Sequence, residues 1–142
     1  MAAPCAPNEL FGWIEDLARY PAWMALVHRA DPLPSVDGVP RWDVELRARV
    51  GPLARSKRLI MTRTLLAPDS DVVFERAEVD GRKHSLWRLS ANVTEVGTGS
   101  HLRMHLHYGG SLWTGGIVER VLHDEITNSR DRLVRLIAET RL

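Results

Sequence analysis

Charged side chains interrupt a stretch of alternating apolar residues in the middle of the chain. Arg76 and Glu78 occupy every second position after Phe74, and Arg63 stands in a similar apolar context. Because a charge that leaves water needs a partner, we expect Arg76 to pair with Glu78 or with Glu125. Such a set could bind the carboxylate or carbonyl end of a ligand. The alternative is that these ions pair for structural reasons, or that the strand ends lie in water.

Further polar residues belong to the same hypothesis. Tyr108 ends a strand-like segment, and Glu125 and Ser129 fall on or beside the apolar stripe of a C-terminal helix. A polar side chain on a buried stripe requires a hydrogen-bond partner or a cavity. These residues could therefore converge with the three charges inside the fold. In an enzyme, Arg76 would stabilise an oxyanion, and Glu78 or Glu125 would act as acid or base.

The histidines and the single cysteine do not indicate a metal site or a nucleophile. The histidines that alternate along one predicted strand are His101, His105 and His107. No Cys, Asp or Glu lies among them to complete a ligand set, so we expect no metal. His84 and His123 are expected in solvent. Cys5 has no evident base in sequence reach, and no cofactor is expected.

Composition limits the classes of function. The 142 residues are 44% hydrophobic and 26% charged, which fits one globular domain spanning 1–142. With 19 basic and 18 acidic residues, the chain offers no electrostatic footprint for nucleic acid or an anionic membrane. The basic run Arg55, Lys57 and Arg58 is expected at a solvated strand end. We find no apolar run long enough for a membrane span, and one cysteine fits a reducing, cytoplasmic location.

Alternating residues predict the strands that would position these side chains. Trp42, Val44 and Leu46 alternate with charged residues, which is the period of a strand with one dry face. Gly51-Pro52 predicts a turn. Asp80-Gly81 predicts a two-residue hairpin turn, after a strand over 72–79. The other strands expected after the first are 57–66, 83–96 and 102–108.

The predicted hairpin places Phe74 directly opposite Trp87 on one face of the sheet. Before the strands, residues 7–28 have helical spacing, and Pro21 should divide them into two short helices. Residues 31–40 contain three prolines and a glycine, which predicts a loop. A long helix is expected from about residue 111 to the end. Its stripe is Val118, Leu122, Ile126, Leu133, Leu136 and Ile137. This order predicts an α+β fold with helices on one face of an antiparallel sheet.

Several segments carry a resemblance to a known family. The most specific is Arg-Tyr-Pro-Ala-Trp-Met at 19–24, where the second short helix begins. The others are Ala-Pro-Asn-Glu-Leu-Phe at 6–11, Trp-Asp-Val at 42–44, Phe-Glu-Arg at 74–76, Trp-Arg-Leu at 87–89 and the C-terminal helix. On these segments the chain resembles the SRPBCC superfamily, which includes START domains, polyketide cyclases and birch-pollen-allergen-like proteins.

The resemblance implies a helix-grip fold, in which a curved seven-stranded antiparallel sheet wraps around a long C-terminal helix. Members of the superfamily bind lipids, sterols, polyketides or other apolar ligands in a cavity between the two, and they share no catalytic set. The first strand normally precedes the first helix by about ten residues, but only residues 1–5 are available here. We therefore expect a very short or missing first strand, a possible exposed edge, and a monomer or weak homodimer.

Inward-facing strand positions and the resemblance together predict which residues contact a ligand. The predicted residues are Trp42, Met61, Arg63, Phe74, Arg76, Trp87, Met104, Tyr108, Glu125 and Ser129. Plain core packing is the alternative for each large ring. Three functions remain open. The first is binding or carriage of an apolar small molecule, the second is a polyketide cyclase or dehydratase, and the third is a protein-interaction module without a ligand.

Overall fold

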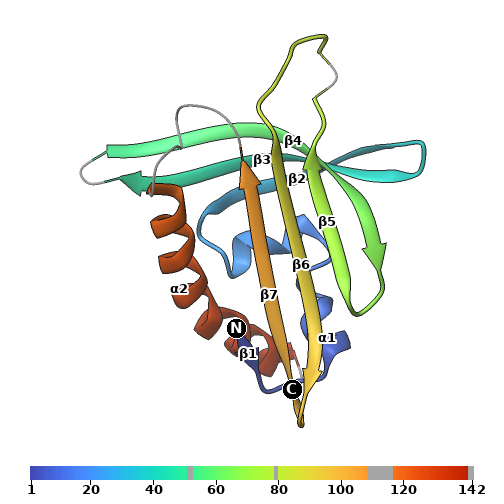
Figure 1. Ribbon diagram of the computed structural model, residues 1–142, viewed down its shortest axis with the longest axis vertical. Helices are drawn as coiled ribbons and strands as arrows, with labels where there is room; N and C mark the ends of the chain where they lie inside the picture. The colour runs from blue at the N-terminus through green and yellow to red at the C-terminus, as the bar shows by residue number, and fades with distance from the viewer. Residues whose placement is uncertain (51–52, 79, 109–116, 141–142) are drawn as a thin grey trace.

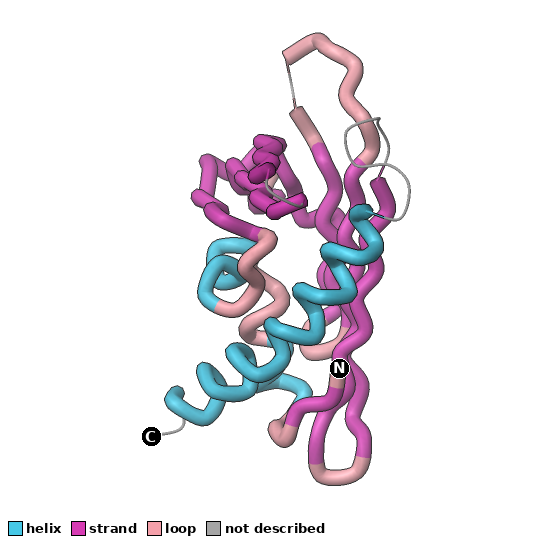
Figure 2. Tube along the Cα trace, turned by 90° about the vertical axis from the view of Figure 1, so that its left-hand side faces the viewer, coloured by secondary structure: helices cyan, strands magenta, loops and turns pink. Residues whose placement is uncertain are grey.

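A computed structural model describes residues 1–50, 53–78, 80–108 and 117–140. Its seven strands form one antiparallel sheet in the order β1-β7-β6-β5-β4-β3-β2. The strands are β1 (Ala2–Ala3), β2 (Val27–Val36), β3 (Val39–Val50), β4 (Leu53–Ala67), β5 (Asp71–Arg76), β6 (Trp87–Val96) and β7 (Gly99–Tyr108). The helices are α1 (Pro7–Phe11), the 3-10 helix η1 (Leu17–Ala22) and α2 (Ile117–Thr140). The sheet is curved (Figure 1), and the helices lie on one side of it (Figure 2), which confirms the predicted helix-grip α+β fold.

The first strand is as short as the sequence predicts. In β1, Ala2 pairs with His101 and Ala3 pairs with Ser100 of β7. A Cβ atom at Gly99 would lie 2.6 Å from the Ala3 carbonyl oxygen, so the close approach of β1 requires glycine there. The Arg130 Nε of α2 donates to the Ala2 carbonyl at 3.0 Å. This contact joins the C-terminal helix to the edge strand.

The N-terminal part of the chain differs from the prediction in two ways. The helical segment breaks between Phe11 and Leu17, and Pro21 lies inside η1 instead of separating two helices. Residues 31–40 are not a loop but the turn end of the β2–β3 hairpin, with the last residues of β2 and the first of β3. Its turn is Asp37-Gly38, with φ of 53° and 77°, a left-handed geometry that this dipeptide favours. Pro32 and Pro34 are tolerated because β2 is an edge strand, where a missing N–H costs no internal ladder bond.

The predicted Asp80-Gly81 hairpin is wrong. Strand β5 ends at Arg76, the described residues 77–78 and 80–86 belong to no helix or strand, and Phe74 pairs with Leu89 instead of Trp87. The register therefore differs by two positions, and because side chains alternate with period two, Phe74 and Trp87 still face the same side. The pairing of β4 with β5 ends at Met61 and Arg76. Beyond it, the Ile60 N–H donates to the Glu78 carboxylate at 3.0 Å instead of to a main-chain carbonyl. The predicted turn at 51–52 lies outside the described residues.

An aromatic cluster fills one part of the core. Trp42 of β3 and Phe74 of β5 meet edge to face, with ring centroids 5.5 Å apart. Tyr20 of η1 contacts Phe74 at 6.1 Å and Trp23 at 4.8 Å. All four rings are buried, and the Tyr20 hydroxyl donates to the Ile14 carbonyl at 2.9 Å. These rings therefore fix η1 to the concave face of the sheet by specific packing.

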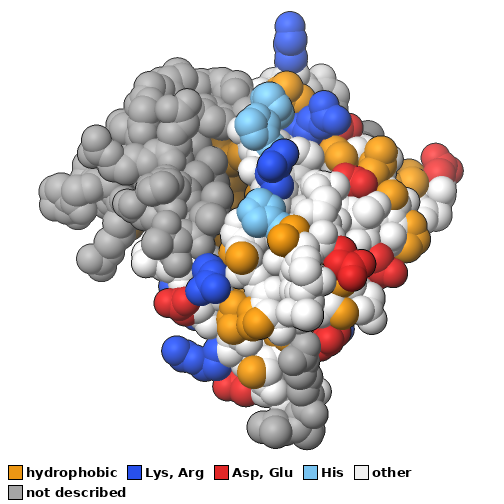
Figure 3. Space-filling view, turned by 60° about the horizontal axis from the view of Figure 1, so that its bottom comes forward, with side chains coloured by type: hydrophobic (Ala, Val, Ile, Leu, Met, Phe, Trp, Pro, Cys, Tyr) orange, Lys and Arg blue, Asp and Glu red, His pale blue; other side chains and the backbone are white. Residues whose placement is uncertain are grey.

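Helix α2 closes the same face. Leu133 and Ile137 of the predicted stripe are buried and Leu136 is partly buried, whereas Val118, Leu122 and Ile126 lie outside the described side chains. The larger exposed apolar side chains are Val36, Leu65, Leu66, Leu86 and Val96. On the face drawn in Figure 3, apolar side chains are scattered among charged ones. Among the described residues, no helix is long and apolar enough to cross a membrane.

Candidate functional site

A cavity of about 80 Å³ lies between the concave face of the sheet and the segment that leads into β2. Its wall is apolar except at His105. The lining residues are Leu17, Met24, Leu26, Val27, Val44, Leu46, Leu59, Met61, Leu89, Met104, His105 and Leu106. A space of this size can hold water, but such a wall offers a water molecule few hydrogen-bond partners. The site is therefore suited to an apolar guest.

Strand register explains why these residues meet. Val44 of β3 pairs with Leu59 of β4, so both side chains lie on the concave face. Leu89 of β6 pairs with Leu106 of β7 on the same face. Large rings occupy the neighbouring positions in the core, whereas here every lining residue except His105 has an aliphatic or thioether side chain. Methionine adapts its shape readily, so Met61 on this wall can accommodate guests of different shapes.

The predicted apolar contact residues divide into two groups. Met61 and Met104 line the cavity. Trp42 and Phe74 lie in the aromatic cluster, where each contacts another ring. Trp87 is buried on the concave face, two positions along β6 from the cavity-lining residue Leu89. The structure thus brings only part of the predicted set to one cavity.

The predicted polar residues are also dispersed. The Arg63 Nη1 donates to the Glu15 carbonyl at 3.0 Å, which ties the segment between α1 and η1 to β4. Ser129 of α2 is fully buried, and its Oγ has no hydrogen-bond partner among the described residues. Tyr108 and Glu125 lie outside the described side chains. Arg76 and Glu78, in contrast, lie directly together.

Arg76 is the centre of a polar cluster at the end of β5. Its Nε donates to the Glu78 Oε2 at 2.7 Å, and the two side chains are only 10% and 12% exposed. Its Nη1 donates to the Ser85 Oγ at 3.0 Å. Its Nη2 lies 3.2 Å from the His84 Nδ1. Because a guanidinium only donates, His84 accepts on Nδ1 and its Nε2–H donates to Asp80, 2.9 Å away.

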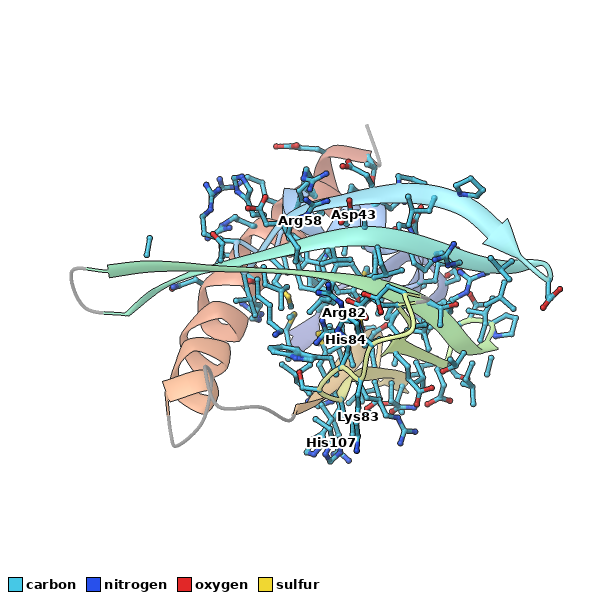
Figure 4. All side chains as sticks on the ribbon, turned by 90° about the horizontal axis from the view of Figure 1, so that it is seen from above. Asp43, Arg58, Arg82, Lys83, His84 and His107 are labelled. Carbon is cyan, nitrogen blue, oxygen red and sulfur yellow. The ribbon has the colours of Figure 1, made fainter. Side chains whose placement is uncertain are left out.

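The prediction that His84 lies in solvent is therefore wrong. In the loop 80–86, His84 reaches Arg76, while its neighbour Lys83 stays exposed. In Figure 4, His84 lies further inward than Lys83. No sequence pattern predicts the contact between Arg76 and His84, because the contact forms only when β5 ends at Arg76.

The cluster keeps Glu78 ionised. Burial pushes the pKa of Glu78 upward, but hydrogen bonds from Arg76, from the Ile60 N–H and from its own N–H outweigh burial. The pKa of Glu78 is therefore held below its usual range. At neutral pH this carboxylate can accept a proton or a hydrogen bond, but it has no proton to donate. The arrangement is a fixed cation next to an anionic base.

Lys57 is a concave-face residue that the sequence interpretation missed. It pairs with the cavity-lining residue Leu46, and its Nζ lies 5.7 Å from the centroid of the Trp87 ring. Burial, followed by the nearby charge of Arg76, lowers the pKa of Lys57. Of the predicted solvated basic run, Arg58 does lie outside, 67% exposed and 2.7 Å from Asp43 (Figure 4).

Lys57 could have been placed inside from its position in the chain, because it continues the same alternation as Leu59 and Met61. Arg55, the third residue of the basic run, lies outside the described side chains. For metals, no group of three or more His, Cys, Asp or Glu side chains in the described residues could hold an ion. The rings of His105 and His107 lie 4.7 Å apart on exposed residues of β7.

Comparison with known proteins identifies the fold. No protein-family model and no curated protein sequence matches the chain. Among solved structures, the di-domain ARO/CYC StfQ from the steffimycin biosynthetic pathway aligns with a TM-score of 0.67 at 15% identity. The alignment covers 99% of this chain and 49% of StfQ, so the chain spans about half the length of StfQ. The chain has the helix-grip fold.

A second solved structure agrees. The helix-grip chain aligns with DR_A0006 from Deinococcus radiodurans with a TM-score of 0.62 and 15% identity. This alignment covers 94% of the chain and 93% of DR_A0006, so the likeness extends over nearly the whole of both proteins. At such identities the likeness establishes the architecture, and the site must be interpreted from its own residues.

Proposed function

We propose that this protein belongs to the SRPBCC superfamily and binds or carries an apolar small molecule in the cavity of its helix-grip fold. The observation that carries the proposal is the apolar wall of the cavity. Protein interiors are normally close-packed, and a cavity in the core costs stability unless something fills it. The likeness to StfQ, an ARO/CYC of a biosynthetic pathway, supports a ligand of the polyketide or lipid kind.

The cavity also limits the ligand. Its volume of about 80 Å³ is small beside the roughly 300–1,000 Å³ of common ligand pockets. Three methionines, Met24, Met61 and Met104, are part of the wall. Because methionine side chains change rotamer easily, a guest with a short chain or one ring can enter with little rearrangement, and a larger one requires the wall to move.

Fluorescence titration with the neutral apolar dye 1-aminoanthracene tests this proposal. Wild type should bind the dye saturably, and the variant Val44→Phe should bind it at least tenfold more weakly, because the new ring occupies the cavity. Val96→Phe is the matched control, since Val96 is exposed on β6. Thermal melts establish that both variants fold. A wild type without saturable binding, or a folded Val44→Phe that binds like wild type, would contradict the proposal.

A second candidate function is a polyketide cyclase or dehydratase, and the Arg76–Glu78 pair is the specific observation that favours it. Arg76 pairs in register with the cavity-lining residue Met61, so the cation lies beside the cavity wall. It could stabilise an oxyanion that develops on a bound carbonyl, with ionised Glu78 as the base. A positioned donor of this kind typically lowers a barrier by about 3–4 kcal/mol.

The test of this candidate separates binding from turnover. Arg76→Met should keep most of the affinity for 1-aminoanthracene but lose turnover of poly-β-ketone mimics in a product assay. Arg88→Met is the control, because Arg88 is exposed and pairs with Glu75 at 3.5 Å, away from Arg76. A wild type that binds the dye but converts none of the mimics would count against the enzyme and leave the carrier.

A further inference from the structure

Lys57 occupies an unusual place at the border of the cavity. Its cross-strand partner Leu46 and its same-face neighbour Leu59 both line the cavity. Directly opposed residues in antiparallel strands have Cβ atoms about 4.5–5.5 Å apart, so the base of the Lys57 side chain lies beside the wall. The ammonium group lies over the Trp87 ring. Lys57 is therefore a cation at the end of an apolar cavity.

Among the described residues, Lys57 differs from the other two cations on this face because it makes no salt bridge and donates no hydrogen bond to a carboxylate or carbonyl. Arg76 donates to Glu78 and Ser85, and Arg63 donates to a main-chain carbonyl. Lys57 forms no salt bridge with a described carboxylate. Its ammonium group lies over the Trp87 ring, and Glu78, which already pairs with Arg76, attracts it only from a longer distance. Burial and the charge of Arg76 lower the pKa of its ammonium group by more than the attraction of Glu78 raises it, so a further anion close to Lys57 would relieve an unfavourable environment.

We propose that Lys57 binds the carboxylate of a small amphipathic ligand whose apolar part occupies the cavity. This inference rests on the proposed binding function and adds the chemical class of the ligand. A monoanion fits better than a dianion such as a phosphate monoester. Lys57 and Arg76 carry two positive charges and Glu78 one negative charge, so one further negative charge balances the three. Asp80 is 46% exposed and is screened by water.

Octanoate and 1-octanol provide a matched pair of probes, because they share the apolar chain and differ in the head group. Isothermal titration calorimetry at neutral pH should show octanoate binding to wild type about tenfold more tightly than 1-octanol, as expected for a charge-assisted contact. Lys57→Met should remove about that tenfold preference and leave 1-octanol binding unchanged, since Met keeps the apolar stem. Lys57→Arg should keep the preference for the acid.

The chain offers a precise control. It contains two lysines, Lys57 and Lys83, and Lys83 is exposed on the loop 80–86. Lys83→Met makes the same change in net charge, so it should leave both affinities unchanged if the effect is local. Equal binding of the two probes to wild type, or equal losses in Lys57→Met and Lys83→Met, would overturn the role of Lys57 while leaving the cavity proposal intact. Binding of neither probe would overturn the cavity proposal itself.

A second measurement does not depend on a folded Lys57 variant. Reductive methylation with ¹³C-formaldehyde labels both lysines and the N-terminal amine, whose NMR signal has its own chemical shift. The lysine signal that disappears in Lys83→Arg belongs to Lys83, and the other belongs to Lys57. Octanoate should shift the Lys57 signal saturably and leave the Lys83 signal in place, whereas 1-octanol should shift the Lys57 signal less. Equal shifts of both lysine signals would contradict a specific carboxylate contact.

Discussion

The concave face of the sheet has two regions that differ in packing. In the first, the rings of Tyr20, Trp42 and Phe74 meet edge to face and leave no space between them. In the second, residues such as Val44 and Met61 surround a cavity, with charged side chains at its border. The two regions share strand β3, but the other rings come from β5 and η1, whereas the rest of the sheet wall of the cavity comes from β2, β4, β6 and β7. The difference indicates that close packing at the ring cluster stabilises the fold, whereas the aliphatic wall leaves a cavity, which is the space that the proposed function requires.

The largest expected effect is the difference in stability loss when a side chain of each region is truncated to alanine. Phe74→Ala should lower the free energy of unfolding by about 3–5 kcal/mol, because it removes a fully buried ring from a close-packed cluster. Met104→Ala should cost about 2 kcal/mol or less, because Met104 is only partly buried and already borders a cavity. Urea denaturation measures both. Equal losses would mean that the two regions are packed alike.

A second prediction concerns the charges at the border of the cavity. Glu78→Gln should cost about 1–3 kcal/mol, because Arg76 loses an ionised partner in a nearly buried site. The matched control is Glu75→Gln, whose carboxylate is more exposed and lies 3.5 Å from Arg88. A surface pair of this kind contributes little, about 0–1 kcal/mol. A loss in Glu75→Gln as large as in Glu78→Gln would refute the special position of the Arg76 cluster.

The same carboxylate predicts a pH dependence. The pKa of Glu78 is lower in the folded protein than in the unfolded chain, so its contribution to stability is complete above the unfolded value, about 4.3. The contribution is lost as the pH falls below that value toward the folded pKa. As the pH falls from 5, the free energy of unfolding of wild type should therefore decrease more than that of Glu78→Gln, as urea denaturation at each pH measures. Parallel curves for the two proteins would contradict the ionised state of Glu78.

The smallest expected effect tests whether the second region has spare volume. Val44→Ile adds one methylene to the cavity wall and should leave stability unchanged or raise it by up to about 1 kcal/mol. Val93→Ile adds the same group at a buried position on β6 that does not line the cavity, and it should cost about 1 kcal/mol or more. A greater loss for Val44→Ile than for Val93→Ile would indicate that the wall is already filled.

The sequence predicted the fold better than the site. Alternation from Trp42 to Leu46 identified a strand and its buried face, and the pairing of β1 with β7 matched the short first strand. The end of β5 could not be predicted, because Asp80-Gly81 has the composition of a tight turn. Contacts of Arg76 with residues up to nine positions away decide the structure there instead. Local turn preference was therefore overridden by a polar cluster.

The contents of the cavity were harder still to predict. Alternation placed Trp42 and Met61 on the same inward face but could not tell which would be packed and which would border a space. That outcome depends on Tyr20 of η1, which fills the space beside the rings and comes from a distant part of the chain. Lys57 was missed because a basic run is usually solvated, although its alternation with Leu59 already placed it inside.

The most direct test of the central claim follows the methionines. The chain has four, and Met24, Met61 and Met104 line the cavity while Met1 does not. With [ε-¹³C]methionine labelling, addition of 1-octanol should shift the three cavity methyl signals saturably and leave Met1 as an internal reference. The shifts should disappear in Val44→Phe. Cavity signals that do not move, or that move no more than Met1 and persist in Val44→Phe, would contradict binding in this cavity.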